Sequence, residues 1–181
     1  MVGFDDGPFD RNRPGGQVLL VGAVCARTRL DGLLTGRVRH DGWNVTERMA
    51  ALVEGSAFRE HIQAVLLSGI TFAGFNVVDL HGLAARLGRP VLVVARRRPR
   101  LEKIRRALAN LPRAERRWGL IEQAGAMEAA GPVLVQRAGL SLMQARELLA
   151  ATTLHGNLPE PLRLAHLIAG GLTTGHSRGR A

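Results

Sequence analysis

Residues 2–9 of the chain read VGFDDGPF. The apolar residues that open this stretch are typical of a buried β-strand, and the Gly-Pro pair at 7–8 is typical of a turn. Between them stand two adjacent carboxylates, Asp5 and Asp6. Neighbouring side chains of a strand point to opposite faces of its sheet. The pair therefore predicts either a strand that ends in a turn at Asp6, or an acidic site at the tip of the strand.

The composition indicates a globular protein. Hydrophobic residues make up 46% of the 181 residues, which predicts a single domain over residues 1–181. The one cysteine, Cys25, excludes an internal disulfide and favours a reducing compartment. The first residues lack the basic stretch of a signal peptide, and the longest apolar run, 18–26, is too short to cross a bilayer. We therefore expect a cytoplasmic protein that has no membrane partner.

The formal net charge of +10 at pH 7 predicts a polyanionic partner. A dense basic block with few acids accounts for much of this charge: Arg96, Arg97, Arg98, Arg100, Lys103, Arg105, Arg106, Arg113, Arg116 and Arg117. Such clustering favours contacts with a phosphate backbone over an inert solvated surface. We expect nucleic acid to be the partner, with a helix after Pro99 contacting its backbone.

The order of the predicted elements indicates the fold class. Apolar runs and period-two alternation predict strands at 2–5, 17–27, 32–40, 64–67 and 91–95, with residues 132–136 as a candidate edge strand. Helices are predicted at 46–53, 56–63, 76–87, 99–110, 114–124, 141–151 and 161–172. Three antiparallel strands followed by two parallel ones, flanked by helices, is the order of the RNase H fold. We therefore predict an α/β, RNase H-like domain with a mixed five-stranded sheet.

This architecture places the first strand at the centre of the sheet and the fourth beside it. Ligands of open α/β sheets bind at the carboxyl ends of the strands. The sequence thus predicts that Asp5 and Asp6 meet Ser68 and Gly69, which follow the fourth strand.

Four motifs carry a resemblance to a known family: GFDDGPF at 3–9, GITFAGFNVVD at 69–79, PEPLRLAHLIA at 159–169 and SRGRA at 177–181. They are similar to those of the endonuclease dU family, a distant relative of endonuclease V. The resemblance covers nearly the whole chain. It implies a metal-dependent DNA endonuclease that acts at deaminated bases such as deoxyuridine in DNA repair, with Mg²⁺ or Mn²⁺ as its cofactor.

The resemblance also implies which residues form the catalytic site. Asp5 matches the first-strand aspartate of the relative, and Glu47 lies about where the relative has a glutamate at the start of its first helix. We expect Asp5, Asp6, Asp79 and Glu47 to be catalytic, with the three aspartates holding the metal, because Mg²⁺ prefers carboxylate oxygens. Glu47 and Asp79 have an alternative role as acids that complement a helix dipole, and Asp41 is also consistent with a simple turn.

Two positions depart from the relative. Ser68 stands where endonuclease V has an aspartate, and the relative's catalytic histidine falls on about Ala138. Either Asp6, Asp41 or Asp79 restores the missing charge, or the chain does not cut by that mechanism. Two alternatives therefore remain open: a nucleic-acid-binding protein that has lost catalysis, and a protein that binds a nucleotide or small molecule in the same crevice.

The substrate-binding candidates come from the same motifs and from the basic residues: Ser68, Gly69, Thr71, Gly74, Asn76, Arg96, Arg97, Arg163, Arg178 and Arg180. Glycines at 69 and 74 permit close approach of a backbone to a ligand. His166, within the PEPLRLAHLIA motif, is interpreted as a structural residue of the last helix.

Overall fold

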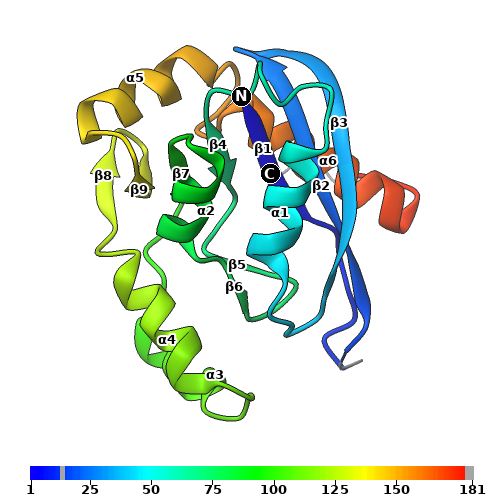
Figure 1. Cartoon of the computed structure of the whole chain (residues 1–181), viewed down its shortest axis with the longest axis vertical. Coiled ribbons are helices and arrows are strands. Elements are labelled where there is room, and N and C mark those ends of the chain that lie inside the picture. The colour runs from blue at the N-terminus through cyan, green and yellow to red at the C-terminus, as the bar shows by residue number, and fades with distance from the viewer. Residues whose placement is uncertain (13–14, 178–181) are drawn as a thin grey trace.

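A mixed sheet of seven strands forms the centre of the part of the chain that the computed structural model describes, residues 1–12 and 15–177 (Figure 1). The strands lie in the order β3-β2-β1-β4-β7-β9-β8. Their bounds, in chain order, are β1 Val2–Asp6, β2 Gln17–Ala26, β3 Arg29–Arg39, β4 Val65–Leu67, β7 Val91–Ala95, β8 Glu128–Ala130 and β9 Val133–Ala138.

The middle of the sheet matches the prediction from the sequence. Strands β1, β2 and β3 form an antiparallel meander, and β4 and β7 run parallel to β1. The predicted number of five strands is wrong, because β9 pairs antiparallel with β7 and β8 folds back on β9 as the edge strand. The sequence of β8, EAA, has no strand periodicity of its own. Its conformation comes from pairing across the short turn between Ala130 and Val133.

Helices cover both faces of the sheet. Their bounds are α1 Val45–Glu54, α2 Leu80–Leu87, α3 Leu101–Leu108, α4 Ala114–Gln123, α5 Leu142–Thr152 and α6 Glu160–Thr174. One face packs on α1 and α2 and the other on α5 and α6, while α3 and α4 form a pair that extends beyond the sheet (Figure 1). Among the described residues, no helix is long and apolar enough to cross a membrane.

Two predicted helices differ from the structure. Residues 56–63 form turns at 57–61 and irregular structure on either side, and Phe58 and Ile62 pack inward onto the core. The helix predicted from residue 76 begins only at Leu80, where Asp79 is the N-cap and its Oδ1 accepts the N–H of Gly82 at 2.8 Å. The residues before it form a small hairpin of β5 Thr71–Phe72 and β6 Asn76–Val77.

The alternation of β1 fixes where α6 lies. Val2 and Phe4 are fully buried in the core beneath α1, so Gly3 and Asp5 point to the opposite face. At Gly3 the backbone of α6 comes so close that an added Cβ would lie 2.5 Å from the carbonyl carbon of Pro161. The absence of a side chain at Gly3 therefore sets the approach of α6 to the centre of the sheet.

We predict that Gly3→Ala destabilises the protein by roughly 1–3 kcal/mol, because the new methyl group meets backbone atoms that cannot rotate away. The control is Gly119→Ala within α4, where a Cβ meets nothing within 4 Å. This control should stabilise the protein by up to about 1 kcal/mol through helix propensity. Urea denaturation of both variants measures the difference, and equal stabilities would contradict the close packing of α6.

Candidate active site

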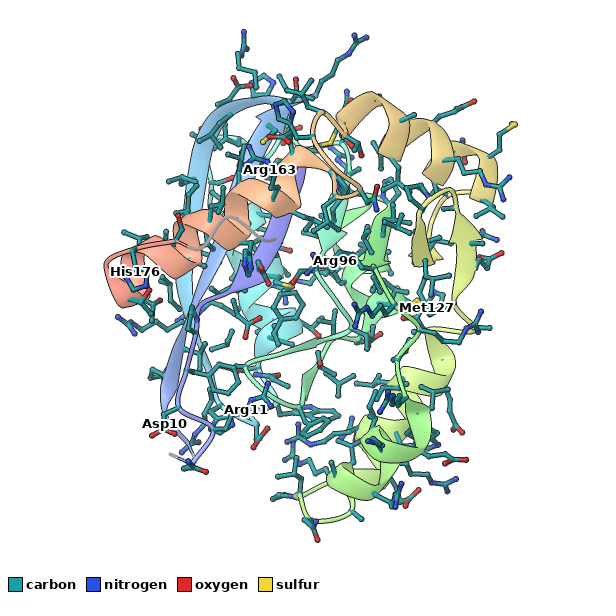
Figure 2. The ribbon with its side chains drawn as sticks, turned by 180° about the vertical axis from the view of Figure 1, so that it is seen from behind. Asp10, Arg11, Arg96, Met127, Arg163 and His176 are labelled. Carbon is teal, nitrogen blue, oxygen red and sulfur yellow. The ribbon has the colours of Figure 1, made fainter. Side chains whose placement is uncertain are left out.

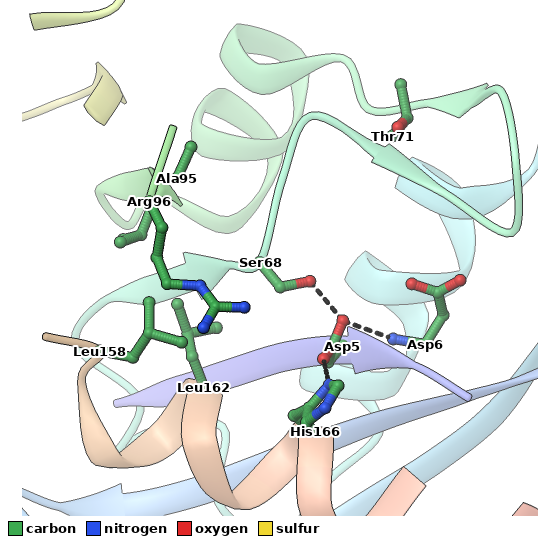
Figure 3. A pocket seen from close by; sticks show the side chains of 10 residues that line it. Asp5, Asp6, Ser68, Thr71, Ala95, Arg96, Leu158, Leu162 and His166 are labelled. Carbon is green, nitrogen blue, oxygen red and sulfur yellow. Dashed lines mark hydrogen bonds and ion pairs between the residues drawn. The ribbon is translucent and has the colours of Figure 1, made fainter. Parts of the chain in front are cut away.

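The carboxyl ends of three parallel strands meet at one edge of the sheet. Phe4 pairs with Leu67 and Leu67 with Val93, so the residues after these pairs gather at the same level. They form a pocket of about 330 Å³ whose lining is completed by α6 (Figure 3). The lining residues are Asp5, Asp6, Ser68, Thr71, Val94, Ala95, Arg96, Leu158, Leu162 and His166.

Asp5 is the centre of the hydrogen bonding in this pocket. Its Oδ1 accepts the hydroxyl of Ser68 at 2.5 Å and the N–H of Asp6 at 3.0 Å. Its Oδ2 lies 2.8 Å from Nδ1 of His166, and since a carboxylate only accepts, Nδ1 carries the proton (Figure 3). The residue is only 8% exposed, so these donors replace the water that the carboxylate has lost.

Asp6 belongs to the strand and not to the turn that follows it. It is the last residue of β1, paired with Leu20, and its carboxylate points to the face opposite Asp5, where Oδ2 accepts the N–H of Ala73 at 2.8 Å. Burial raises the pKa of Asp6 to about 6, and the nearby charge of Asp5 acts in the same direction. Both acids still line one pocket, because β4 ends at Leu67 and leaves the tip of β1 open on both faces.

His166 is the functional candidate that the sequence interpretation missed. The hydrogen bond with Asp5 raises the pKa of its imidazole, and its side chain is 44% exposed. The helix register carried the signal: His166 is four residues after Leu162, which packs on the sheet, so both lie on one face of α6. Ala138, where a histidine was expected, is buried on β9 opposite Val91, at the other end of β7 from this pocket.

Glu47 and Asp79, two of the expected catalytic acids, are engaged elsewhere. Glu47 is an exposed residue of α1 that forms an ion pair with Arg86 of α2. Asp79 caps α2, and its own N–H donates to the hydroxyl of Thr46 at 2.9 Å. Within residues 1–12 and 15–177, no group of three or more His, Cys, Asp or Glu side chains is placed to hold a metal. The structure therefore brings Asp5 and Asp6 together but does not bring Asp79 to them.

Some of the expected substrate-binding residues line the pocket, and others do not. Ser68, Thr71 and Arg96 line the pocket, and the exposed Arg97 follows Arg96 in the chain. Asn76 is fully buried; its Oδ1 accepts the N–H of Val45 at 3.1 Å and its Nδ2 donates to the carbonyl of Arg39 at 3.2 Å. These bonds tie the hairpin to the start of α1, which is a structural role.

The remaining candidates do not line this pocket. Gly69 follows Ser68 but is not among the lining residues. Arg163 forms an ion pair at 2.7 Å with Glu160, one turn earlier on α6 (Figure 2). Arg178 and Arg180 lie outside the described residues.

A second cavity, of about 490 Å³, opens on the other side of Asp6. Its lining residues are Asp6, Phe9, Arg11, His40, Asp41, Thr71, Ala73, Gly74 and Phe75. Asp41 accepts the N–H of Phe75 at 2.8 Å, so it holds the hairpin loop in place. Gly74 has φ +86°, and an added Cβ would lie 2.3 Å from Oδ1 of Asp41, so a side chain at this position would be strained and would displace Asp41. Asp41 is thus part of the cavity wall as well as of a turn.

The basic block does not form a uniform surface. Arg117 is 3% exposed, and its guanidinium donates to the carbonyls of Gly42 at 2.8 Å and Asp41 at 2.7 Å. Burial lowers the pKa of this guanidinium. Arg117 thus holds α4 against the loop after β3, whereas the arginines at 96–98 and 100 are exposed near the end of β7.

The chain is similar to known proteins over most of its length. The model of the family described as endonuclease dU matches residues 1–173. A UPF0215 protein of Deinococcus radiodurans is 54% identical over 180 residues, which is 99% of this chain and 91% of that protein. A crystal structure of a protein of unknown function from Archaeoglobus fulgidus has a TM-score of 0.91 at 35% identity, covering 97% of this chain and 98% of that one.

The fold is also similar to that of a more distant structure. Endonuclease V of Ciona intestinalis, in complex with a 24mer DNA that contains an inosine followed by a ribo-adenosine, has a TM-score of 0.56 at 15% identity. The similarity covers 91% of this chain and 81% of that one. At this identity the comparison shows a shared mixed α/β fold.

We predict that Asp6→Asn stabilises the metal-free protein. Because the folded-state pKa of Asp6 is raised above its unfolded value, the wild type loses stability as the pH rises through about 6. The asparagine still accepts from Ala73 but carries no charge. The gain should be small at pH 4 and reach roughly 1–3 kcal/mol at pH 8. Urea denaturation with a chelator measures it, with the exposed Asp10→Asn as the control that should show no such gain.

Proposed function

Because the chain belongs to the endonuclease dU family, we propose that it is a metal-dependent endonuclease that cleaves DNA at deaminated bases such as deoxyuridine. The proposal includes a role in DNA repair in the cytoplasm. One observation carries it: the buried carboxylate of Asp5 at the carboxyl end of the central strand, held by Ser68 and His166 in an open pocket beside Arg96. This arrangement combines the carboxylate oxygens of Asp5, the imidazole of His166, which can transfer a proton, and the cation of Arg96, which suits a phosphate.

We assign the sheet to the RNase H type. The order β3-β2-β1-β4-β7, with three antiparallel strands followed by two parallel ones, supports this assignment. In this assignment β9 and β8 are an extension on the edge of β7. We keep the prediction that residues 1–181 form a single domain.

We propose that a divalent cation is held by the two carboxylates that line the pocket, Asp5 and Asp6. Mg²⁺ in such sites takes one or two carboxylates, several waters and the phosphates of the substrate. Asp5 uses three of about four lone-pair positions, and Oδ2 of Asp6 accepts the N–H of Ala73, so each carboxylate keeps acceptor capacity for a ligand. Asp5 and Asp6 would therefore hold Mg²⁺ or Mn²⁺. A bound metal of this kind activates water and neutralises charge on the phosphodiester.

The other pocket residues contribute chemistry of their own. The bond between Nδ1 of His166 and Asp5 orients the imidazole and leaves Nε2 to exchange a proton with the reacting groups. Ser68 donates to Asp5 and keeps its oxygen lone pairs for a ligand. Arg96 lines the same pocket, and its planar guanidinium suits a phosphate. We place Thr71 at the substrate, because it lines both this pocket and the neighbouring cavity.

The alternative is a nucleic-acid-binding protein that does not cut. The absence of a third acid beside Asp5 and Asp6 among the described residues is the observation that favours it. Such a protein should bind DNA equally well in chelator and show no dependence on Asp5. A protein that binds only a small molecule in this pocket should instead show little dependence on salt, because it contacts few phosphates.

We predict metal-dependent cleavage of labelled oligonucleotides that carry uracil. Asp5→Asn and His166→Ala should each reduce the rate by at least about 100-fold, since they remove a metal ligand and a proton-transfer group. Glu47→Gln and Asp79→Asn are the matched controls and should retain most of the activity, because neither residue lines the pocket. Asparagine at 79 can still cap α2.

The assay uses duplex and single-stranded substrates with uracil, hypoxanthine or no lesion, each in Mg²⁺, Mn²⁺ or chelator. Intact DNA in every lane, together with DNA binding that survives in Asp5→Asn, would rule out the nuclease and leave the binding protein. Loss of activity in Glu47→Gln or Asp79→Asn would return those acids to the site.

We also predict that Mn²⁺ raises the melting temperature of the wild type in the absence of DNA, because a ligand that binds only the folded state stabilises it. The shift should be absent in Asp5→Asn and unchanged in Glu47→Gln. Thermal denaturation with and without Mn²⁺ measures it independently of cleavage. Equal shifts in all three proteins would place the metal elsewhere.

A further inference from the structure

A third cavity, of about 370 Å³, lies beside the proposed active site, between the end of β7 and helices α3 and α4. Its lining residues are Ile70, Arg98, Pro99, Leu101, Ile104, Trp118, Ile121, Glu122, Gly125, Ala126, Met127 and Gln136. We call it the α4 pocket. Two chain segments contribute residues to both sites. In one, Thr71 lines the active-site pocket and Ile70 the α4 pocket; in the other, Arg96 lines the active-site pocket and Arg98 the α4 pocket. Figure 2 labels Arg96 at the end of β7 and Met127 between α4 and β8.

The walls of the α4 pocket suit a flat apolar group. Most of the lining side chains are aliphatic, and Trp118 and Met127 add an aromatic ring and a polarisable thioether. Two contacts hold the ring of Trp118: its indole N–H donates to Glu122 at 2.6 Å, and the guanidinium of Arg105 lies over the ring, 5.3 Å from its centre. A cavity of this size matches the pockets that hold small ligands in proteins.

The inner wall carries a hydrogen-bond acceptor that lacks a donor. Gln136 is 5% exposed, and its Nε2 donates to the carbonyl of Gly125 at 2.6 Å, which identifies the other atom as the carbonyl oxygen Oε1. That Oε1 is the one buried side-chain N or O atom of the described residues without a hydrogen-bond partner. Such atoms are rare in folded proteins, because an unpaired buried acceptor is costly. A purely apolar ligand would leave Oε1 unpaired, whereas a ring with an N–H group could donate a hydrogen bond to it.

The rim of the α4 pocket is basic. Arg98 lines the pocket, and Arg97, Arg100 and Lys103 are exposed nearby around the start of α3, together with one acid, Glu102. The carboxylate of Glu122 is already bound to Trp118. Positive charge beside an aromatic wall is the combination that binds the phosphate and the base of an unpaired nucleotide. A nucleotide would use both features together with the buried acceptor, because its base is flat and carries N–H donors and its phosphate is negative.

We propose that the α4 pocket binds one unpaired nucleobase, with the base packed against Trp118 and Met127 and an N–H group of its edge donating to Gln136. The partner class rests on the proposed function: the base would belong to the polynucleotide that crosses the active-site pocket, on the side of Arg98. This site would hold the strand in place without touching the reacting atoms. Its binding to a free nucleoside requires neither metal nor cleavage.

Fluorescence of Trp118 tests this proposal in the full-length chain. Trp43→Phe leaves Trp118 as the only tryptophan, and chelator is present throughout. The probes are adenosine and purine riboside, which differ only in the amino group that can donate to Gln136. Adenosine should change the emission in a saturable way, and purine riboside should bind at least about tenfold more weakly, as expected for one unpaired buried group.

The matched variant is Gln136→Leu, which removes the acceptor and should bind both nucleosides with equal, weak affinity. Ala126→Phe provides a second route, because residue 126 is exposed and a larger side chain there fills the pocket; it should abolish binding. The proposal is overturned if neither nucleoside gives a saturable change, or if Gln136→Leu keeps the preference for adenosine. Cleavage is measured separately, so a nuclease without this pocket and a nucleoside-binding protein without cleavage give different results.

Discussion

The buried carboxylate of Asp5 is the constraint on which the arrangement of this edge of the molecule depends. A carboxylate that is 8% exposed is tolerated only when donors replace its water. Here the donors come from the backbone of β1, from the residue after β4 and from α6, three elements far apart in the sequence. The pairing of Asp5 with His166 therefore fixes α6 over β1, and Gly3 provides the space that this approach requires. The side chain of Asp5 therefore links the position of α6 to the geometry of the site.

The central part of the fold could be predicted from the sequence because local patterns determine it. The apolar runs of β1, β2, β4 and β7 and the capping of α5 by Ser141 are encoded in neighbouring residues. Strand β8 and the hairpin of β5 and β6 could not be predicted in this way. Their few residues acquire strand conformation only by pairing with a partner strand. The apolar residues around Asn76 are equally compatible with a helix, but α2 begins only after its N-cap, Asp79.

The parts of the candidate site that lie at strand ends could be predicted from the sequence. The part that depends on how α6 is oriented could not. Parallel pairing alone brings Asp5 and Ser68 together, as expected. Which side of α6 faces the sheet depends on packing, so a half-exposed histidine in an apolar helix was read as structural. Asp79 shows the reverse case: an acid beside a Gly-rich motif was expected to hold a metal, and in the structure its carboxylate caps α2.

Local charge at this edge gives the proposed cation and Arg96 complementary roles. The net charge of +10 overstates what a polyanion meets there, because some arginines are already paired within the protein: the buried Arg117 with backbone carbonyls and the exposed Arg86 with Glu47 and Glu54. The pocket itself presents Asp5 and Asp6, which repel a phosphodiester. Burial already opposes the ionised form of Asp6, so the free protein loses stability by keeping that charge. A divalent cation between the two acids would remove this cost and the repulsion together, and Arg96 would complete a site able to accept a phosphate.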